Sequence, residues 1–171
     1  MHPTPTSGVD SLQELAARLL FSAVEWAKQI PFFPDLSVTD QVALFKWTWS
    51  EMFVLNVSQS EMPINVAPLL AAAGFQNNLA PDQAINFMDH IRLFQDQINK
   101  FRQLKVDPAE YTLLKAIVFF TPDAHGLTDV NFVESIQQKC FNALEEYCKN
   151  NHSNDVCRLG KLRIYSSQKS F

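Results

Sequence analysis

Glycine is scarce in this chain of 171 residues, which has only four glycines but nine prolines. Tight turns between paired strands usually need glycine, so a strand-rich fold is not expected. The apolar runs are long and periodic, and prolines punctuate them. This pattern favours an all-α fold. The length and the 47% of hydrophobic residues are typical of one globular domain with its own core.

Paired cysteines, a secretory leader and clustered basic residues are also absent from the sequence. Cys140, Cys148 and Cys157 form no Cys-x-x-Cys pair, and the N-terminus has no basic and apolar secretory pattern. A net charge of −4 offers phosphates little attraction, so we expect no direct binding of nucleic acid. Lys46 and Glu51 interrupt the longest apolar run, which argues against a membrane span. We therefore expect a reducing compartment, the cytosol or the nucleus.

The common catalytic signatures are missing as well. The sequence has no Gly-rich phosphate loop, no Gly-x-Ser-x-Gly and no His-Glu-x-x-His. Asp89 precedes His90, and Asp123 lies two residues before His125, but such pairs are usually solvated and no nucleophile accompanies them here. We therefore predict that the chain is not an enzyme.

One spacing resembles a metal cluster, namely Cys148-x3-His152-x4-Cys157. Zinc sites normally use tighter paired spacings and four ligands. We interpret these residues as two core cysteines and a loop histidine, and we predict neither a metal site nor a cofactor.

Capping signals and periodic apolar positions predict several helices. Ser11 and Glu14 open a helix on residues 12–30, which Pro31 ends. Ser37 with Asp40 opens a second helix that reaches about residue 57. The remaining helices are expected at residues 69–73, 81–101 and 107–118, and from a Thr128 or Asp129 cap to residue 147. Residues 61–68 are either irregular or a small hairpin, and too few apolar positions follow residue 150 for another full helix face.

The second helix is apolar on its whole circumference, which few helices are. Its apolar residues are Val42, Leu44, Phe45, Trp47, Trp49, Met52, Phe53, Val54 and Leu55. Such a helix must be buried on nearly all sides. We therefore expect it in the middle layer of a helical bundle.

The stretch WAKQIPFFPDLSVTDQVALF, residues 26–45, combines an aromatic-Ala-Lys sequence, a Phe and a Leu downstream, and Asp-Gln followed by paired apolar residues. It resembles the signature of the nuclear receptor ligand-binding domain. The stretches ARLLFSAVEWA, WSEMFVLN, VAPLLAAAG, FMDHIR, LKAIVFFTPDAHGL and ALEEY further resemble the COUP transcription factor (Seven-up) subfamily. The likeness covers about residues 12–162.

The resemblance implies a three-layer antiparallel helical sandwich in residues 11–165, with disordered tails at residues 1–10 and 166–171. It implies an orphan receptor domain in the nucleus that binds coregulator helices and pairs with a receptor of its own or another kind. In these receptors a separate zinc domain reads DNA. The alternative from another class is an all-α carrier of an apolar ligand.

By the same resemblance, a groove for a short amphipathic coregulator helix lies beside the first turns of the second long helix. The implied floor is Val24, Phe33, Val38, Val42 and Phe45, and the implied polar rim is Lys28, Gln41 and Lys46. Lys28 is expected to cap the C-terminal carbonyls of the bound helix, where a cation is favourable. The alternative role for Lys28 is to stabilise the C-terminus of its own helix.

The resemblance also implies a ligand pocket and an ion pair. The implied pocket residues are Leu12, Ala16, Leu19, Trp49 and Phe53. Acid-binding receptors place an arginine where this chain has Ser60, so we expect a core that aromatic side chains fill, without a ligand. Glu51 is expected to pair with Lys115, because a carboxylate on a buried helix needs a partner; the alternative is a Glu51 that reaches solvent.

The sequence departs from the family at its end, RIYSSQKSF, where family members continue into a dimerisation helix and an activation helix. We expect these last helices to be missing. We expect their loss to favour the binding of corepressor helices over coactivator helices, and therefore a repressive or decoy role. We also expect it to weaken the dimer. The alternative is an incomplete product without a stable fold.

Overall fold

The computed structural model describes residues 17–18, 21–60 and 81–167. The helices are η1 (Phe33–Asp35), α2 (Val38–Gln59), α4 (Pro81–Gln103), α5 (Pro108–Phe119), α6 (Val130–Asn151) and α7 (Arg158–Ser167), and residues 21–28 are also helical. No strand occurs in these ranges, which confirms the all-α prediction. The expected hairpin at residues 61–68 and the helix at 69–73 lie outside the described residues.

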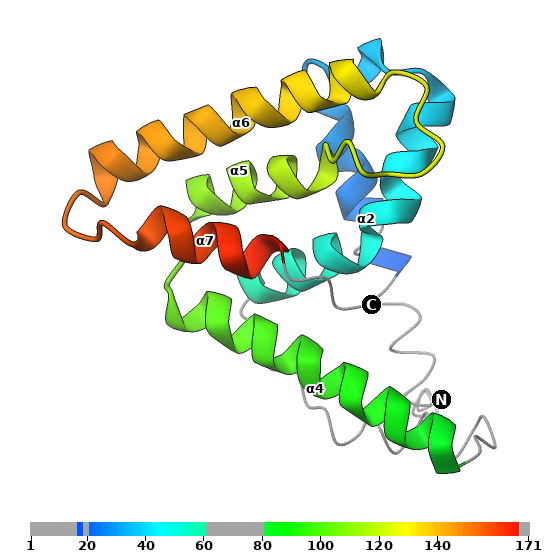
Figure 1. The fold of residues 1–171 in the computed structure, drawn as a ribbon, viewed down its shortest axis with the longest axis vertical. Coiled ribbons are helices and arrows are strands. Elements are labelled where there is room, and N and C mark those ends of the chain that lie inside the picture. The colour runs from blue at the N-terminus through cyan, green and yellow to red at the C-terminus, as the bar shows by residue number, and fades with distance from the viewer. Residues whose placement is uncertain (1–16, 19–20, 61–80, 168–171) are drawn as a thin grey trace, which may run out of the picture.

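The helices form layers, with α6 on one side, α4 on the other, and α2, α5 and α7 between them (Figure 1). Helix α5 packs on both α6 and α2, while α2 also packs on α4. Helix α7 contacts α4, α5 and α6. This arrangement agrees with the three-layer sandwich and explains why α2 is apolar on all sides, since it meets other helices on more than one face.

Two groups of buried side chains make up the core of the described residues. One is centred on Phe33, Leu44 and Phe119, and the other joins α2, α4, α5, α6 and α7 through residues such as Leu55 and Phe101. Helix α2 contributes to both groups, so it links the two halves of the core. At about 25 cal/mol per Å² of apolar surface, burial of these side chains is the main stabilising term of the fold.

The predicted caps are largely confirmed. The Ser37 hydroxyl accepts the amide N–H of Asp40 at the start of α2. Asp107 and Glu110 form a complete capping box on α5, and Asp129 caps α6 by accepting the amide N–H of Phe132. A cap of this kind contributes about 1 kcal/mol, and it fixes where each helix begins.

Helix α7 lies after residue 150, where the sequence predicted too few apolar positions for another full helix face. It has few apolar residues, but Leu162 is fully buried, Arg158 is 93% buried, and Leu159 and Tyr165 pack against the core. Across the described helices, none combines the length and the apolar character that a membrane crossing needs.

Candidate functional site

The turn before α2 positions the residues of the predicted groove. Pro34 lies within η1, and Phe33 and Leu36 are each only 5% exposed. The side-chain amide of Gln41 donates hydrogen bonds to the carbonyl oxygens of Phe33, at 3.2 Å, and Leu36, at 3.1 Å. Gln41, predicted as a polar rim residue, therefore fixes the turn onto α2.

The first turns of α2 present apolar side chains to solvent. Val38 is 74% exposed and Val42 is 44% exposed, although both are branched apolar residues. Lys46 is also exposed. It lies one turn further on the same face, because residues four apart on a helix are neighbours. We call Val38, Val42 and Lys46 the α2 face. On the preceding helical residues 21–28, Val24 is half-buried and Lys28 is exposed, also four residues apart.

An aromatic layer lies beneath this region. The Phe45 ring is half-buried, and its centroid lies 4.8 Å from that of Phe119 and 5.9 Å from that of Phe33. Phe33, predicted for the groove floor, is buried and packs beneath this region.

Lys28 lies near the end of its helical segment and faces solvent. Its amine is 3.4 Å from the Glu25 carboxylate, with the lysine side chain 60% exposed and the glutamate 49% exposed. An exposed pair of this kind contributes about 0–1 kcal/mol, so a stronger acceptor can replace Glu25 at little cost. Lys28 is thus available to an incoming ligand.

Asp40 ties the start of α2 to the loop between α5 and α6. Its carboxylate is 1% exposed and accepts the amide N–H groups of Thr128, at 2.6 Å, and Asp129, at 3.1 Å, together with the Thr128 hydroxyl. Burial alone raises the pKa of Asp40, but the bonds from Thr128 and Asp129 outweigh it and lower the pKa below 3.8. Asp40 was expected in a capping box with Ser37, and only the Ser37 half of that box is observed.

The lowered pKa gives a pH-dependence prediction. The folded state binds the Asp40 proton less tightly than the unfolded state, so the stabilisation is complete above about pH 4 and is lost as the pH falls through the folded pKa. We expect Asp40→Asn to lower the free energy of unfolding by about 1.5–3 kcal/mol at pH 7 and by less under acid conditions. Urea melts at pH 7 and near pH 3 measure both values, and an equal loss at the two pH values would contradict the assignment.

The implied ligand pocket is described only in part, because Leu12, Ala16 and Leu19 lie outside the described residues. Trp49 is 56% exposed, and its place in the ligand pocket stays a prediction. Phe53 is half-buried and packs edge-on against Phe94 of α4, with 5.9 Å between ring centroids. A cavity of about 270 Å³ lies between α2, α5, α6 and α7, and of the two predicted pocket residues that the structure describes, neither Trp49 nor Phe53 lines it.

The expected pair of Glu51 and Lys115 is not formed. The Lys115 amine donates a hydrogen bond to the side-chain oxygen of Gln59, two turns further along α2, and burial lowers the pKa of Lys115. The Glu51 carboxylate instead accepts a hydrogen bond from the Ser50 hydroxyl at 3.0 Å. Glu51 is half-buried and lines the cavity between α2, α5, α6 and α7.

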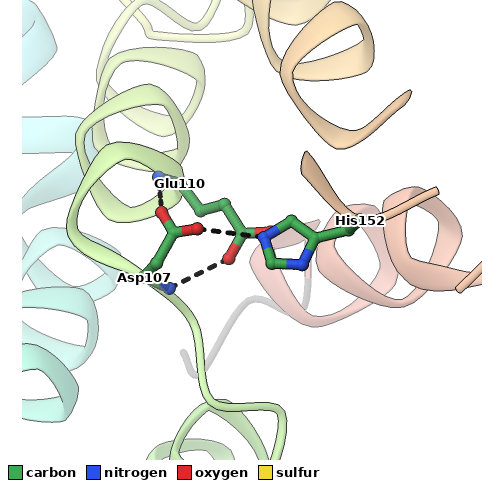
Figure 2. Close-up of side chains that lie close together, drawn as sticks. All are labelled: Asp107, Glu110 and His152. Carbon is green, nitrogen blue, oxygen red and sulfur yellow. Dashed lines mark hydrogen bonds and ion pairs between the residues drawn. The ribbon is translucent and has the colours of Figure 1, made fainter. Parts of the chain in front are cut away.

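The buried charges meet elsewhere, at the junction of α5, α6 and α7. Glu110 is fully buried, and both its oxygens accept hydrogen bonds from the Arg158 guanidinium, with 2.7 Å between Nη2 and Oε2. The Glu110 carboxylate raises the pKa of Arg158. Asp107 and His152 lie beside the Glu110 carboxylate (Figure 2). We call Asp107, Glu110, His152 and Arg158 the junction cluster.

The polar groups of the junction cluster are densely bonded. His152 Nε2 lies 3.0 Å from Asp107 Oδ2 and 3.3 Å from Glu110 Oε1, and the Tyr147 hydroxyl donates to Asp107 Oδ2. Arg158 also donates to the backbone carbonyls of residues 104 and 105. The sequence predicted the capping box of Asp107 and Glu110 and interpreted His152 as a loop histidine. It did not predict that Arg158 and His152 meet this box, because they are more than 40 residues away in the chain.

Comparisons with known proteins agree with the resemblance seen in the sequence. Residues 1–163 match the family described as the ligand-binding domain of nuclear hormone receptor. The chain is 60% identical over 165 residues to the steroid receptor seven-up, isoforms B/C, of Drosophila melanogaster, covering 96% of this chain and 30% of that protein. It is 58% identical to nuclear receptor subfamily 2 group F member 5 of Danio rerio and 53% identical to group F member 6 of Homo sapiens. Each of these two matches spans 158 residues, which is 92% of this chain and 39% of the relative. The chain thus spans about a third of the length of these relatives.

Proposed function

The chain belongs to the family of nuclear hormone receptor ligand-binding domains, and on this premise we propose that it regulates transcription by binding the helices of coregulator proteins. The binding surface is the α2 face together with Val24 and Lys28 of the preceding helix. We further propose a nuclear location and pairing with a second receptor chain. The DNA of the regulated genes is contacted by other segments or partners, since this chain has a net charge of −4.

The exposed valines of α2 are the observation that carries this proposal. Val38 and Val42 lie four residues apart on one helix face, with 74% and 44% of their surfaces exposed. An amphipathic helix presents apolar side chains at the same spacing, so it can cover both valines at once. The aromatic layer of Phe33, Phe45 and Phe119 packs beneath this face and supports it.

The expected free energies of binding assign different roles to the valines and the lysines. Burial of one leucine-sized side chain of the partner contributes about 1.5–3 kcal/mol, whereas a contact between an exposed cation and a helix C-terminus contributes about 0.3–1 kcal/mol. The valines therefore supply most of the affinity. Lys28 and Lys46, both exposed, set the direction of the bound helix, because its C-terminal carbonyls are attracted to a cation.

The test is to replace Val42 by arginine. We expect Val42→Arg to abolish binding of a coregulator helix peptide, because a charge replaces the apolar contact, while the far-ultraviolet circular dichroism stays unchanged since the side chain is 44% exposed. Fluorescence anisotropy of a labelled peptide measures the affinity.

Val156→Arg is the control. Val156 is 92% exposed and lies between α6 and α7, at the opposite end of α6 from Asp129, which bonds Asp40 of α2. Its substitution is expected to leave peptide affinity unchanged, and unchanged affinity in Val42→Arg would reject the surface. Tighter binding of a long corepressor-type helix than of a short coactivator-type helix supports a repressive role, and the reverse order supports activation.

A further inference from the structure

The cavity of about 270 Å³ between α2, α5, α6 and α7 has walls that are largely apolar. Leu114 and Leu144 are each 1% exposed and line it, so the cavity extends to the buried core. A dry cavity of about 150 Å³ is large enough for benzene. The space between these helices therefore fits one aromatic ring with a short polar chain. The other apolar lining residues are Trp47, Ile117, Val118 and Phe141.

This cavity is separate from the two binding regions discussed above. Neither Trp49 nor Phe53 of the implied ligand pocket lines it, and no residue of the α2 face does. Helix α7 contributes Arg163, Ser166 and Ser167 to the lining. A molecule bound in this cavity contacts four helices and leaves the α2 face uncovered.

One carboxylate of the lining has little compensation from the protein. Glu51 is half-buried, and the hydrogen bond described for its side chain comes from the Ser50 hydroxyl, 3.0 Å from Oε2. Lys115, its expected partner, donates to Gln59 instead. A carboxylate has about four acceptor positions, so within the described part of the chain most of those of Glu51 are not used by protein groups. A positively charged N–H group can form a strong, charge-assisted hydrogen bond with it.

Two other polar side chains of the lining use donors on the backbone. The Thr48 hydroxyl donates to the carbonyl oxygen of Leu44 at 2.8 Å. The side-chain amide of Gln137 donates to the carbonyl oxygen of Ile117 at 2.9 Å, and its own side-chain oxygen remains an acceptor. These bonds favour a ligand that donates hydrogen bonds over one that accepts them.

The charges of the lining also favour a cation over an anion. Glu51 and Asp123 are acidic, and Arg163 is basic. Arg163 is exposed, with its guanidinium 5.0 Å from the centre of the Phe141 ring, so water and salt screen its charge. Glu51 is half-buried, where an opposite charge is attracted more strongly than in water.

We propose that this cavity binds a small aromatic amine in its protonated form. The ammonium group donates a hydrogen bond to the Glu51 carboxylate, and the ring lies among Leu114, Ile117 and Leu144. An aromatic acid of the same size is repelled by Glu51 and Asp123. A neutral alcohol of the same size gains the apolar contact but forms a weaker bond to Glu51.

Methyl NMR titrations of the 171-residue chain near pH 7 test the proposal with three matched probes. The probes are 2-phenylethylammonium, 2-phenylethanol and phenylacetate. We expect the ammonium probe to have a dissociation constant about tenfold lower than that of the alcohol, because its bond to Glu51 is charge-assisted. Phenylacetate is expected not to bind. No binding of the ammonium probe, or equal affinity for it and the alcohol, overturns the proposal.

Glu51→Gln tests the role of the carboxylate. We expect it to bring the dissociation constants of the ammonium probe and the alcohol to within about twofold of each other, since the charge is gone while the size is kept. Glu134→Gln is the matched control, because Glu134 is exposed on α6 and does not line the cavity. It is expected to keep the tenfold preference. A preference that persists in Glu51→Gln overturns the assignment of the ammonium group.

Nuclear Overhauser effects between the probe ring and protein methyl groups locate the probe in the unmodified chain. We expect them with methyl groups of Leu114, Ile117 and Leu144, which line the cavity. Overhauser effects that involve none of these three residues overturn the site, even where the ammonium probe binds and Glu51→Gln fails to fold.

Discussion

Replacing Arg158 by methionine is expected to lower the free energy of unfolding by about 3–5 kcal/mol. Glu110 has no exposed surface and receives two hydrogen bonds from the Arg158 guanidinium. Methionine fills much of the same volume but leaves the carboxylate buried without its counter-charge. Since the total stability of a domain is about 5–15 kcal/mol, this single change brings the chain close to unfolding.

Urea melts followed by circular dichroism measure this loss. Arg163→Met is the control on the same helix, because Arg163 is exposed and its guanidinium lies over the Phe141 ring; we expect a loss below about 1 kcal/mol. In the double variant with Glu110→Gln, the loss is expected to be smaller than the sum of the single losses, because the stranded charge is gone. Additive losses would mean that the pair is not coupled.

Replacing Phe119 by alanine is expected to cost about 3–5 kcal/mol as well, for a different reason. Phe119 is fully buried at the end of α5, and its ring lies 4.8 Å from Phe45, 5.1 Å from Phe120 and 6.1 Å from Trp26. Alanine removes the ring that these neighbours pack around and leaves a cavity. The aromatic layer under the α2 face loses its centre.

The midpoint of urea unfolding reports this loss, and Phe119→Leu should restore more than half of the stability because it refills most of the volume. Phe32→Ala is the matched control, since Phe32 is 38% exposed and makes one contact with the Lys139 amine, 5.1 Å from its ring centre. We expect a loss of about 1 kcal/mol or less there. If the urea midpoint of Phe119→Ala equals that of Phe32→Ala, the aromatic layer is not the centre of the buried group around Phe33, Leu44 and Phe119.

The helix starts could be predicted because capping is local chemistry. Ser37, Asp107 and Asp129 each bond a backbone N–H three residues on, and the sequence contains both partners within one turn. Only the resemblance assigned Val38 and Val42 to a surface groove, whereas periodicity alone indicated a helix buried on all sides. The structure leaves Val38 and Val42 exposed in the first turns of α2.

Partners distant in sequence could not be predicted in the same way. Lys115 was assigned to Glu51 but bonds Gln59, two turns further on, because the register between α2 and α5 is set by packing along their whole length. Asp40 was assigned to its own cap and instead holds Thr128 and Asp129. A buried carboxylate accepts hydrogen bonds from the donors that the fold brings near it, and these donors cannot be identified from the local sequence.

The sequence by itself determined the all-α class, the helix boundaries marked by caps and prolines, and the family to which the chain belongs. These depend on periodicity, capping and a contiguous signature, all of which act over a few residues. Only the tertiary structure decided that Glu110 meets Arg158, that His152 and Cys148 converge on Asp107 and Glu110, and that Phe33 lies under the surface rather than on it. These outcomes depend on how α5, α6 and α7 pack, and that packing minimises exposed apolar area and unpaired charge over the whole chain at once.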